Sequence, residues 1–267
     1  MSNSTPQDTP QDQAGRFRAL HQGPVFVVPN PWDAGSAKAL EKIGFHALAT
    51  SSGNAAMVLG RRDGQITRDE SLAHAKAIVE AVDIPVAADL ENGFGADPAH
   101  VAETIRLAAG VGLAGGSIED ASGDPERPLY SFEHAVERIA AAAQAARALP
   151  APFVLTARCE NFLRGNPDLD DTIRRLQAFA AAGADVLFAP GLPTLDAVRT
   201  VCTALEGKPV NFMVGIKGKS FSVAELEAAG VRRISLATSL YRAAMSGFQR
   251  AAREVFDAGT FSYLDTL

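Results

Sequence analysis

The chain has 267 residues, of which 47% are apolar and 21% are charged, and its net charge is −6. This length suits one α/β barrel, which takes about 250 residues, and the apolar content is enough to fill a sizeable core. An acidic chain gains nothing by approaching nucleic acid or an anionic membrane, so we expect neither as a partner.

Cysteine usage and the N-terminus narrow the class of protein. The two cysteines, Cys159 and Cys202, form no CxxC pair, which argues against zinc fingers and disulfide scaffolds and favours a reducing compartment. No apolar run approaches the ~18 residues that span a bilayer. The first residues are polar and lack the apolar stretch of a signal peptide. We therefore expect a disordered tail over residues 1–15 of a cytoplasmic protein, and one catalytic domain over residues 16–267.

Short apolar runs alternate with alanine-rich helical stretches along the rest of the chain. The predicted strands are Val25–Pro29, Ala47–Ser51, Val86–Leu90, Gly116–Asp120, Phe153–Arg158, Val186–Pro190, Val210–Val214 and Arg233–Ala237. Residues that can cap helices follow them: Asp33, Thr67 with Glu70, Asp97 before Pro98, Ser131, Thr194, and Ser222 with Glu225. Gly44, Gly183 and Gly230 fit left-handed helix ends before the next strand.

Strict strand–helix alternation predicts a parallel sheet with right-handed crossovers. Eight such units close into a single (β/α)8 barrel. The alternative is an open, doubly wound sheet, which is disfavoured because the repeat count reaches eight and no glycine-rich nucleotide fingerprint follows the first strand.

In such a barrel the chemistry lies at the C-terminal ends of the strands. The acids concentrate at two neighbouring exits, where Asp89 and Glu91 are two residues apart and Glu119 ends the next strand. On a strand, that spacing points both side chains to one face. Three close carboxylates are costly to ionise together unless a cation lies among them, and all-oxygen ligands favour Mg²⁺ or Mn²⁺. We expect the neighbouring Asp120 and Glu160 to be surface carboxylates or helix caps.

Arg158 is the one basic residue at the end of a predicted strand. It has two interpretations, a partner for the acids or a receptor for a substrate carboxylate, and both can hold together. By alternation Cys159 faces outward, which argues against a nucleophilic role. No histidine falls at a strand exit, which argues against a catalytic triad or a zinc site. Lys217 and Lys219 leave a Schiff-base aldolase as a minor alternative to solvated loop lysines.

Short motifs at these exits follow one another in a specific order. They are Asn30-Pro31-Trp32-Asp33-Ala34, Ser51-Ser52-Gly53, Leu59-Gly60-Arg61-Arg62-Asp63-Gly64, Asp89-Leu90-Glu91-Asn92-Gly93-Phe94-Gly95, Ser117-Ile118-Glu119-Asp120 and Thr156-Ala157-Arg158. In these motifs, and from about Phe17 to about Phe256, the chain resembles the isocitrate lyase/phosphoenolpyruvate mutase superfamily.

The resemblance implies a role for each matching residue. It implies that Asp89 binds Mg²⁺ directly, and that Asp63, Glu91 and Glu119 act largely through metal-bound water. It also implies that Arg158 and backbone groups near Ser51, Ser52 and Gly53 hold a 2-oxo acid or its enolate. At other strand exits, Trp32 and Asn211 are further candidate substrate contacts. The candidate catalytic residues are thus Arg158, Glu119 and Asp63, and the candidate metal residues are Asp89, Glu91 and Glu119.

Two departures from the family pattern limit the reaction. The usual Asp-x-Asp after the third strand is Asp89-Leu90-Glu91 here. The family's isocitrate and methylisocitrate lyases carry a Lys-Arg/Lys-Cys-Gly-His loop after the fourth strand, whereas residues 121–130 have no cysteine, histidine or lysine. The missing cysteine argues against both of those activities, and the missing lysine argues against a phosphonomutase or phosphonopyruvate hydrolase. Tyr130 and water are the candidate proton donors.

The sequence thus predicts a Mg²⁺-dependent lyase that makes or breaks a C–C or P–C bond beside a 2-oxo acid through an enolate. One alternative is phosphoenolpyruvate mutase or carboxyphosphonoenolpyruvate-type transfer, and another is a barrel that only binds an oxo acid. The partner is a small anionic substrate. The family implies a homo-oligomer, a dimer or tetramer, often with exchanged C-terminal helices. This chain ends soon after its eighth helix, which favours a short exchanged helix or none.

Overall fold

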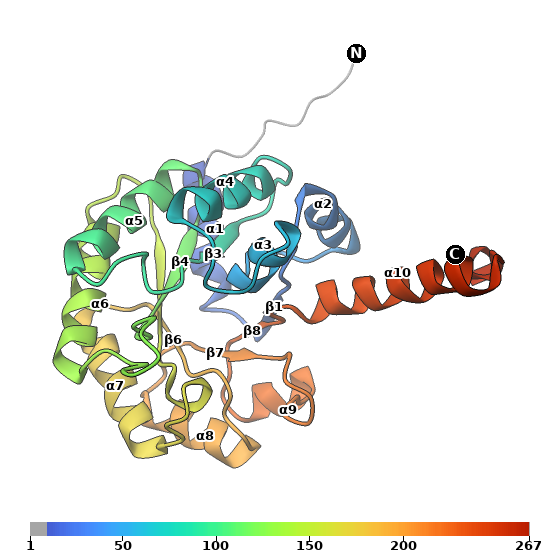
Figure 1. The fold of residues 1–267 in the computed structure, drawn as a ribbon. Helices are drawn as coiled ribbons and strands as arrows, with labels where there is room; N and C mark the ends of the chain where they lie inside the picture. The colour runs from blue at the N-terminus through green and yellow to red at the C-terminus, as the bar shows by residue number, and fades with distance from the viewer. Residues whose placement is uncertain (1–9, 267) are drawn as a thin grey trace.

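A parallel barrel forms the body of the protein, with helices around its outside (Figure 1). The structure is a computed structural model and describes residues 10–266. Within that range the strands are β1 (Phe26–Val28), β2 (Leu48–Ala49), β3 (Val86–Asp89), β4 (Gly115–Glu119), β5 (Val154–Arg158), β6 (Val186–Phe188), β7 (Val210–Met213) and β8 (Arg233–Ser235). Each lies within one residue of a predicted run, and the predicted (β/α)8 barrel is confirmed.

The sheet is parallel throughout, in the order β1-β8-β7-β6-β5-β4-β3-β2. Asn30, just after β1, holds the seam between β1 and β2. Its Nδ2 donates to the carbonyl oxygens of Ala49 (3.0 Å) and Thr50 (3.1 Å), and its Oδ1 accepts from the Leu236 amide (2.7 Å). The Ala49 amide donates to Pro29 (3.1 Å). One buried amide side chain therefore joins the exits of β1, β2 and β8.

The α-helices are α1 (Pro10–Leu20), α2 (Ala34–Ile43), α3 (Ser52–Val58), α4 (Arg68–Val79), α5 (Pro98–Gly110), α6 (Phe132–Arg147), α7 (Leu169–Ala182), α8 (Leu195–Ala204), α9 (Val223–Ala228) and α10 (Ser239–Ala258), with 3-10 turns at Asn161–Leu163 and Ser262–Thr266. Six of these α-helices begin at a predicted cap. The predicted capping boxes at Thr67 and Ser222 form, and Asp33, Asp97, Ser131 and Thr194 cap their helices. Gly44, Gly183 and Gly230 have the expected positive φ.

Helix α1 corrects the expected extent of the N-terminal tail. Residues 10–15, which we assigned to the tail, form the first part of this helix, whereas residues 1–9 lie outside the described range. Ala14 and Phe17 are buried against β1, β5 and β6, so apolar contact holds this segment on the barrel despite its polar composition. Gly115 makes room for the ring, because a Cβ there would lie 3.0 Å from Phe17 Cε1.

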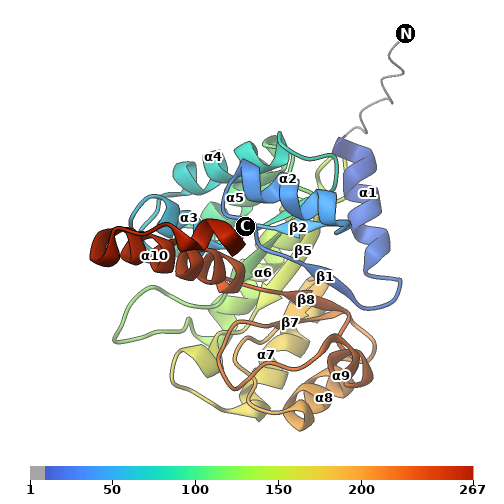
Figure 2. The ribbon, with the colours of Figure 1, turned by 90° about the vertical axis from the view of Figure 1, so that its right-hand side faces the viewer.

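Helix α10 differs from the other helices in its position. It projects away from the barrel in Figure 1, and in Figure 2, where that side faces the viewer, it lies in the foreground. No residue of α10 is buried, and no other element packs extensively against it. No helix within residues 10–266 is both long enough and apolar enough to cross a membrane.

Replacement of Phe17 tests the role of α1. The side chain is fully buried, so Phe17→Ala should lower the free energy of unfolding by about 3–5 kcal/mol, measured by urea denaturation. Arg18→Ala on the same helix removes an exposed side chain that makes a surface ion pair (3.7 Å to Asp185), and it should cost no more than about 1 kcal/mol. Equal small losses in both variants would show that α1 does not stabilise the barrel.

Candidate active site

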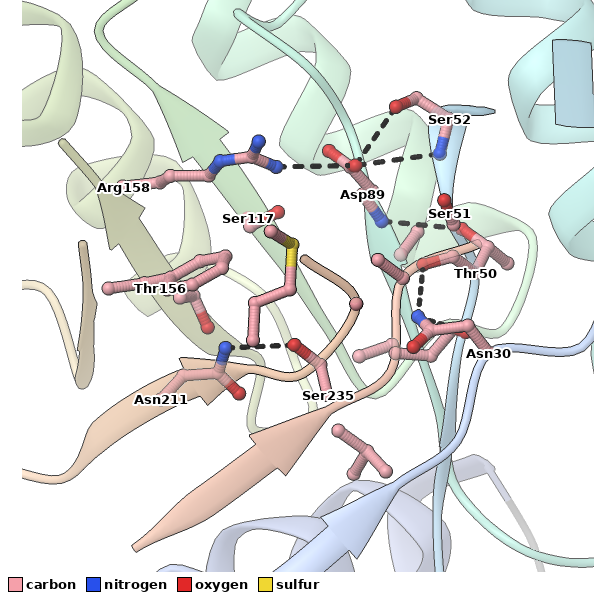
Figure 3. Close-up of a pocket in the computed structure, with 18 of the residues that line it drawn as sticks. Asn30, Thr50, Ser51, Ser52, Asp89, Ser117, Thr156, Arg158, Asn211 and Ser235 are labelled. Carbon is pink, nitrogen blue, oxygen red and sulfur yellow. Dashed lines mark hydrogen bonds and ion pairs between the residues drawn. The ribbon is translucent and has the colours of Figure 1, made fainter. Parts of the chain in front are cut away.

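A cavity of about 290 Å³ opens among the residues that end the strands (Figure 3). It continues into the barrel interior, where small side chains such as Ala87 and Thr156 leave space. Six predicted site residues line it: Ser51, Ser52, Asp63, Asp89, Arg158 and Asn211. Four do not: Trp32, Gly53, Glu91 and Glu119.

Asp89 ends β3 and faces the cavity. Its Oδ2 accepts from the Ser52 hydroxyl (3.0 Å) and amide (3.4 Å) and lies 3.4 Å from Arg158 Nη1, as Figure 3 shows. Its Oδ1 accepts from the Glu91 amide (3.2 Å). These donors fix the orientation of the carboxylate, and Ser52 is available because Ser51 caps α3 and places Ser52 in the first turn.

Glu91 lies beside Asp89 for a different reason from the one expected. The strand ends at Asp89, so strand alternation does not apply. Instead Glu91 has a left-handed backbone (φ 48°), and its carbonyl accepts from the Glu119 amide (2.9 Å). Its carboxylate Oε1 is buried and has no hydrogen-bond partner among the described residues. Burial raises the pKa of Glu91 to about 7, and the carboxylates of Asp89 and Asp63 contribute to the rise.

Arg158, at the end of β5, lies among three carboxylates. Its Nε pairs with Glu160 and lies 3.5 Å from Glu119 Oε2, and its Nη1 reaches Asp89. Burial raises the pKa of Glu119, and Arg158 opposes the rise. Of the two interpretations predicted for Arg158, these contacts show the pairing with acids. Among the described residues Nη2 has no partner, so one nitrogen of this cavity-lining side chain is left for a ligand.

Glu160 was assigned to the surface or to a cap, and that assignment is wrong. Its side chain is 1% exposed and contacts both Arg158 and Arg164, whose Nη2 also lies 3.4 Å from Glu119 Oε1. The assignment of Asp120 is wrong in the same way. Asp120 is buried, pairs with Arg175 (3.1 Å) and accepts from the Glu160 amide (2.8 Å). Asp120 is reached by Arg175 from α7, which is distant in the sequence, whereas Glu160 is buried between arginines two and four residues away.

The charges of this cluster suit a divalent cation. Asp89, Glu91, Glu119 and Glu160 carry four negative charges when ionised and Arg158 and Arg164 carry two positive ones, which leaves −2. The unpaired Glu91 oxygen and its raised pKa agree with a shortage of positive charge in this cluster. Within residues 10–266, no three His, Cys, Asp or Glu side chains converge as a preformed metal site. Mg²⁺ needs only one or two carboxylates when it keeps its waters, so the residues fit this ion with Asp89 as the ligand.

Asp63, Trp32 and Asn211 are the remaining candidate residues. Asp63 is exposed at the cavity rim, and a Cβ on Gly53 would lie 3.7 Å from its carboxylate. Trp32 packs edge to face on Tyr241 of α10, with ring centroids 5.7 Å apart. Asn211 lines the cavity, but its amide is held by Arg233 and Ser235.

The two cysteines and the two loop lysines do not line the cavity. Cys159 is buried in the core, where burial raises the pKa of its thiol well above its usual range. Neither cysteine is among the residues that line the cavity, and neither Lys217 nor Lys219 is.

The segment of residues 121–130 forms a short, closed turn in which Ala121 pairs with Leu129. Tyr130, a candidate proton donor, packs its ring on the Arg138 guanidinium (4.2 Å) and on His134 instead of lining the cavity. Arg138 is fully buried and donates to the carbonyls of Gly95 (2.6 Å) and Ala96 (2.7 Å), and also to Asn92. It therefore holds the loop after Glu91, a role that nothing in the α6 sequence indicated.

Comparisons with known proteins find relatives that match nearly the whole chain. A family model for phosphoenolpyruvate phosphomutase matches residues 17–256. The chain is 32% identical over 215 residues to 2,3-dimethylmalate lyase of Eubacterium barkeri (77% of this chain, 73% of that protein). It is 31% identical over 255 residues to 2-methylisocitrate lyase of Escherichia coli (92% and 83%). A Burkholderia cenocepacia J2315 protein, whose crystal structure is described only as that of a lyase or mutase, is 52% identical with a TM-score of 0.94 (97% and 92%).

The raised pKa of Glu91 predicts a pH dependence of stability in metal-free protein. The pKa is about 7 in the folded chain against an ordinary value of 4.5. The contribution of Glu91 is therefore fully present below pH 4.5 and is lost as the pH rises through about 7. Glu91→Gln removes this ionisation and should reduce the loss by about 1–2 kcal/mol, allowing for partial exposure. Urea unfolding in EDTA at pH 5 and pH 7.5 measures it.

Glu80→Gln provides the control for this experiment, because Glu80 is exposed on α4 and makes only a surface ion pair with Lys76. This variant should keep the pH dependence of the wild type. A Glu91→Gln protein with the same slope as the wild type would show that Glu91 titrates in the folded chain as it does in water.

Proposed function

The chain belongs to the isocitrate lyase/phosphoenolpyruvate mutase superfamily, whose members act on oxo acids, and from this premise we propose that it is a Mg²⁺-dependent lyase. The reaction makes or breaks the C–C bond beside a 2-oxo acid through its enolate. The observation that carries the proposal is the excess of carboxylates at the cavity, with Asp89 in its wall and an unpaired Glu91 oxygen behind it.

Each residue has a defined task in this proposal. Mg²⁺ on Asp89 would supply positive charge to the oxygens of the oxo acid. Ser52 and the Glu91 amide keep the Asp89 carboxylate turned toward the cavity. Arg158 offers Nη2 to the substrate while Asp89 and Glu160 fix its plane. Glu119 does not line the cavity, so it acts through Arg158 as a positioning residue. Asp63 at the rim is placed to order water.

The segment after β4 bears on which bond is cleaved. It is short and closed, and it brings no cysteine, lysine or histidine to the cavity. The acid–base cysteine of a methylisocitrate lyase therefore has no counterpart here, despite the overall similarity to that enzyme. The similarity to a lyase of a smaller substrate, 2,3-dimethylmalate, favours C–C cleavage over P–C cleavage.

Oxalate, a mimic of the pyruvate enolate, tests the proposal. Calorimetric titration should show binding to wild type with Mg²⁺ and little binding without it, because the carboxylate cluster repels an anion. Asp89→Ala should abolish the effect of Mg²⁺. Arg158→Lys keeps the charge but cannot contact Asp89, Glu160 and oxalate together, and it should weaken binding about ten- to a hundredfold, or ~1.5–3 kcal/mol.

The two variants separate the two parts of the site. Oxalate binding that is equal with and without Mg²⁺ would refute the metal site. Metal-dependent binding that ignores Arg158→Lys would leave the metal in place and make Arg158 only a partner of the acids. With a panel of 2-hydroxy and 2-oxo acids, 2-methylisocitrate should give no turnover.

We further propose that the protein is a homo-oligomer held together by α10. Tyr241, Met245, Phe248, Val255 and Phe256 recur at the helical spacing of one face, and Phe248 and Phe256 are 63% and 90% exposed. The helix is long and projects from its own barrel, where we had expected a short exchanged helix or none (Figure 1). A second copy of the chain would cover this apolar face.

Charge on the apolar face should separate the subunits. Phe248→Glu should convert the dimer or tetramer to monomer in light scattering at micromolar concentration, because a carboxylate would be buried without a partner. Arg250→Ala, on the opposite face of α10, should leave the mass unchanged. A monomeric wild type would refute the proposal, and so would a Phe248→Glu variant of unchanged mass.

A further inference from the structure

Arg233 is a buried cation on the floor of the cavity. It begins β8, is 6% exposed and lines the cavity deep inside the barrel. Its Nε donates to Asn211 Oδ1 (2.8 Å), its Nη2 donates to Thr156 Oγ1 (2.9 Å), and its Nη1 lies 3.4 Å from His21 Nε2. Each of these partners is a neutral group. No carboxylate within residues 10–266 forms an ion pair with it.

His21 does not supply the missing charge. Its Nδ1 lies 2.8 Å from the Phe17 carbonyl, which can only accept, so Nδ1 carries the proton and Nε2 accepts from Arg233. Burial lowers the pKa of His21 to about 3, and Arg233 contributes to the lowering, so the ring is neutral. The guanidinium is therefore desolvated without a counterion, which is unfavourable unless an anion joins it.

The hydrogen bonds of Arg233 also decide which way its neighbours point. A guanidinium has donors only, so Asn211 must turn its Oδ1 to Arg233 and its Nδ2 to the Ser235 hydroxyl oxygen (3.0 Å). Ser235 and Thr156 thus accept from nitrogen, and their own protons point elsewhere. Asn211, Ser235 and Thr156 all line the cavity, and Figure 3 shows them apart from Asp89 and Ser52. The floor presents donors and no carboxylate.

The floor lies at a defined depth below the acid cluster. Thr156 and Arg158 are two residues apart on β5, so they face the same side and lie ~7 Å apart along the strand. A ligand whose oxo-acid end lies at Asp89 and Arg158 therefore reaches the floor through a short carbon chain.

We propose that Arg233, Asn211, Thr156 and Ser235 form a floor subsite that binds a second carboxylate of the substrate. The substrate is then a short dicarboxylic 2-oxo acid, or the larger acid that yields it, and Arg233 determines the specificity. This inference rests on the proposed function, because the other end of the ligand occupies the site at Asp89. The competing explanation is that Arg233 only pins His21 and α1 to the barrel.

Matched ligands distinguish the two explanations. With Mg²⁺ present, calorimetry compares oxaloacetate with 2-oxobutanoate and 2-oxoglutarate with 2-oxopentanoate, pairs that differ in the terminal carboxylate. Wild type should bind at least one diacid tenfold or more tighter than its partner. Arg233→Met should abolish that preference and change oxalate affinity less than twofold. The control is Arg232→Met, at the adjacent residue, whose guanidinium donates to the Gly23 carbonyl outside this cavity.

Ser235→Ala tests the floor subsite independently, in case the Arg233→Met protein does not fold. It removes one hydroxyl with little effect on packing and should reduce the diacid preference about threefold or more. A wild type without the preference overturns the floor subsite, as does a preference that survives Arg233→Met. Equal losses for oxalate and diacid in folded Arg233→Met also overturn it, since they indicate a structural role. Oxalate that fails to bind wild type with Mg²⁺ instead refutes the proposed function, and the floor is then judged on the diacid pairs alone.

Discussion

The Arg158 guanidinium lies among the carboxylates of Asp89, Glu119 and Glu160, and the C-terminal face of the barrel is organised around these pairings. One cation cannot neutralise three anions, and Arg164 reaches only two of them from the outside. The imbalance appears as a raised pKa at Glu91 and at Glu119, because burial penalises charge that has no partner. In the function that we propose, such a site would bind anionic substrates poorly until a cation is added, so metal binding would be a condition for substrate binding.

Backbone strain near Asp89 is held by contacts far from the cavity. Glu91 and Phe94 both have positive φ, at 48° and 59°, which side chains other than glycine rarely adopt. Arg138 donates to three carbonyls of this loop from α6, and Tyr130 covers the guanidinium. The short segment after β4 thus supports the loop after β3, and this support places the Glu91 carboxylate beside Asp89. The catalytic geometry therefore depends on packing between two loops and a helix.

Periodicity was sufficient to predict the barrel, because each strand is a short apolar run and most of the helices between the strands begin at a residue that caps them. It could also place Asp89 and Arg158, since the end of a barrel strand faces the cavity. It failed at Glu91, which follows the end of β3 and turns back through a left-handed residue. It also failed at Asp120, whose partner Arg175 lies on α7, and at Glu160, which is buried between the nearby Arg158 and Arg164. Periodicity also gave no indication of Arg233, because an arginine that begins a strand has no local signal of burial.

The two ends of the cavity have opposite charge imbalances, with excess anions near Asp89 and an uncompensated cation at Arg233. Their mutual attraction does not cancel the two costs. Even if the two groups lay only ~7 Å apart, a pair of unit charges at an effective dielectric of 20 would gain ~2.4 kcal/mol, whereas burial of each ion costs several kcal/mol. The hydrogen bonds that fix Asp89 and Arg233 prevent the two side chains from moving toward each other. A cation at Asp89 and an extended anion between that cation and the floor would relieve both ends together, and this is the charge pattern of the metal-bound diacid that we propose.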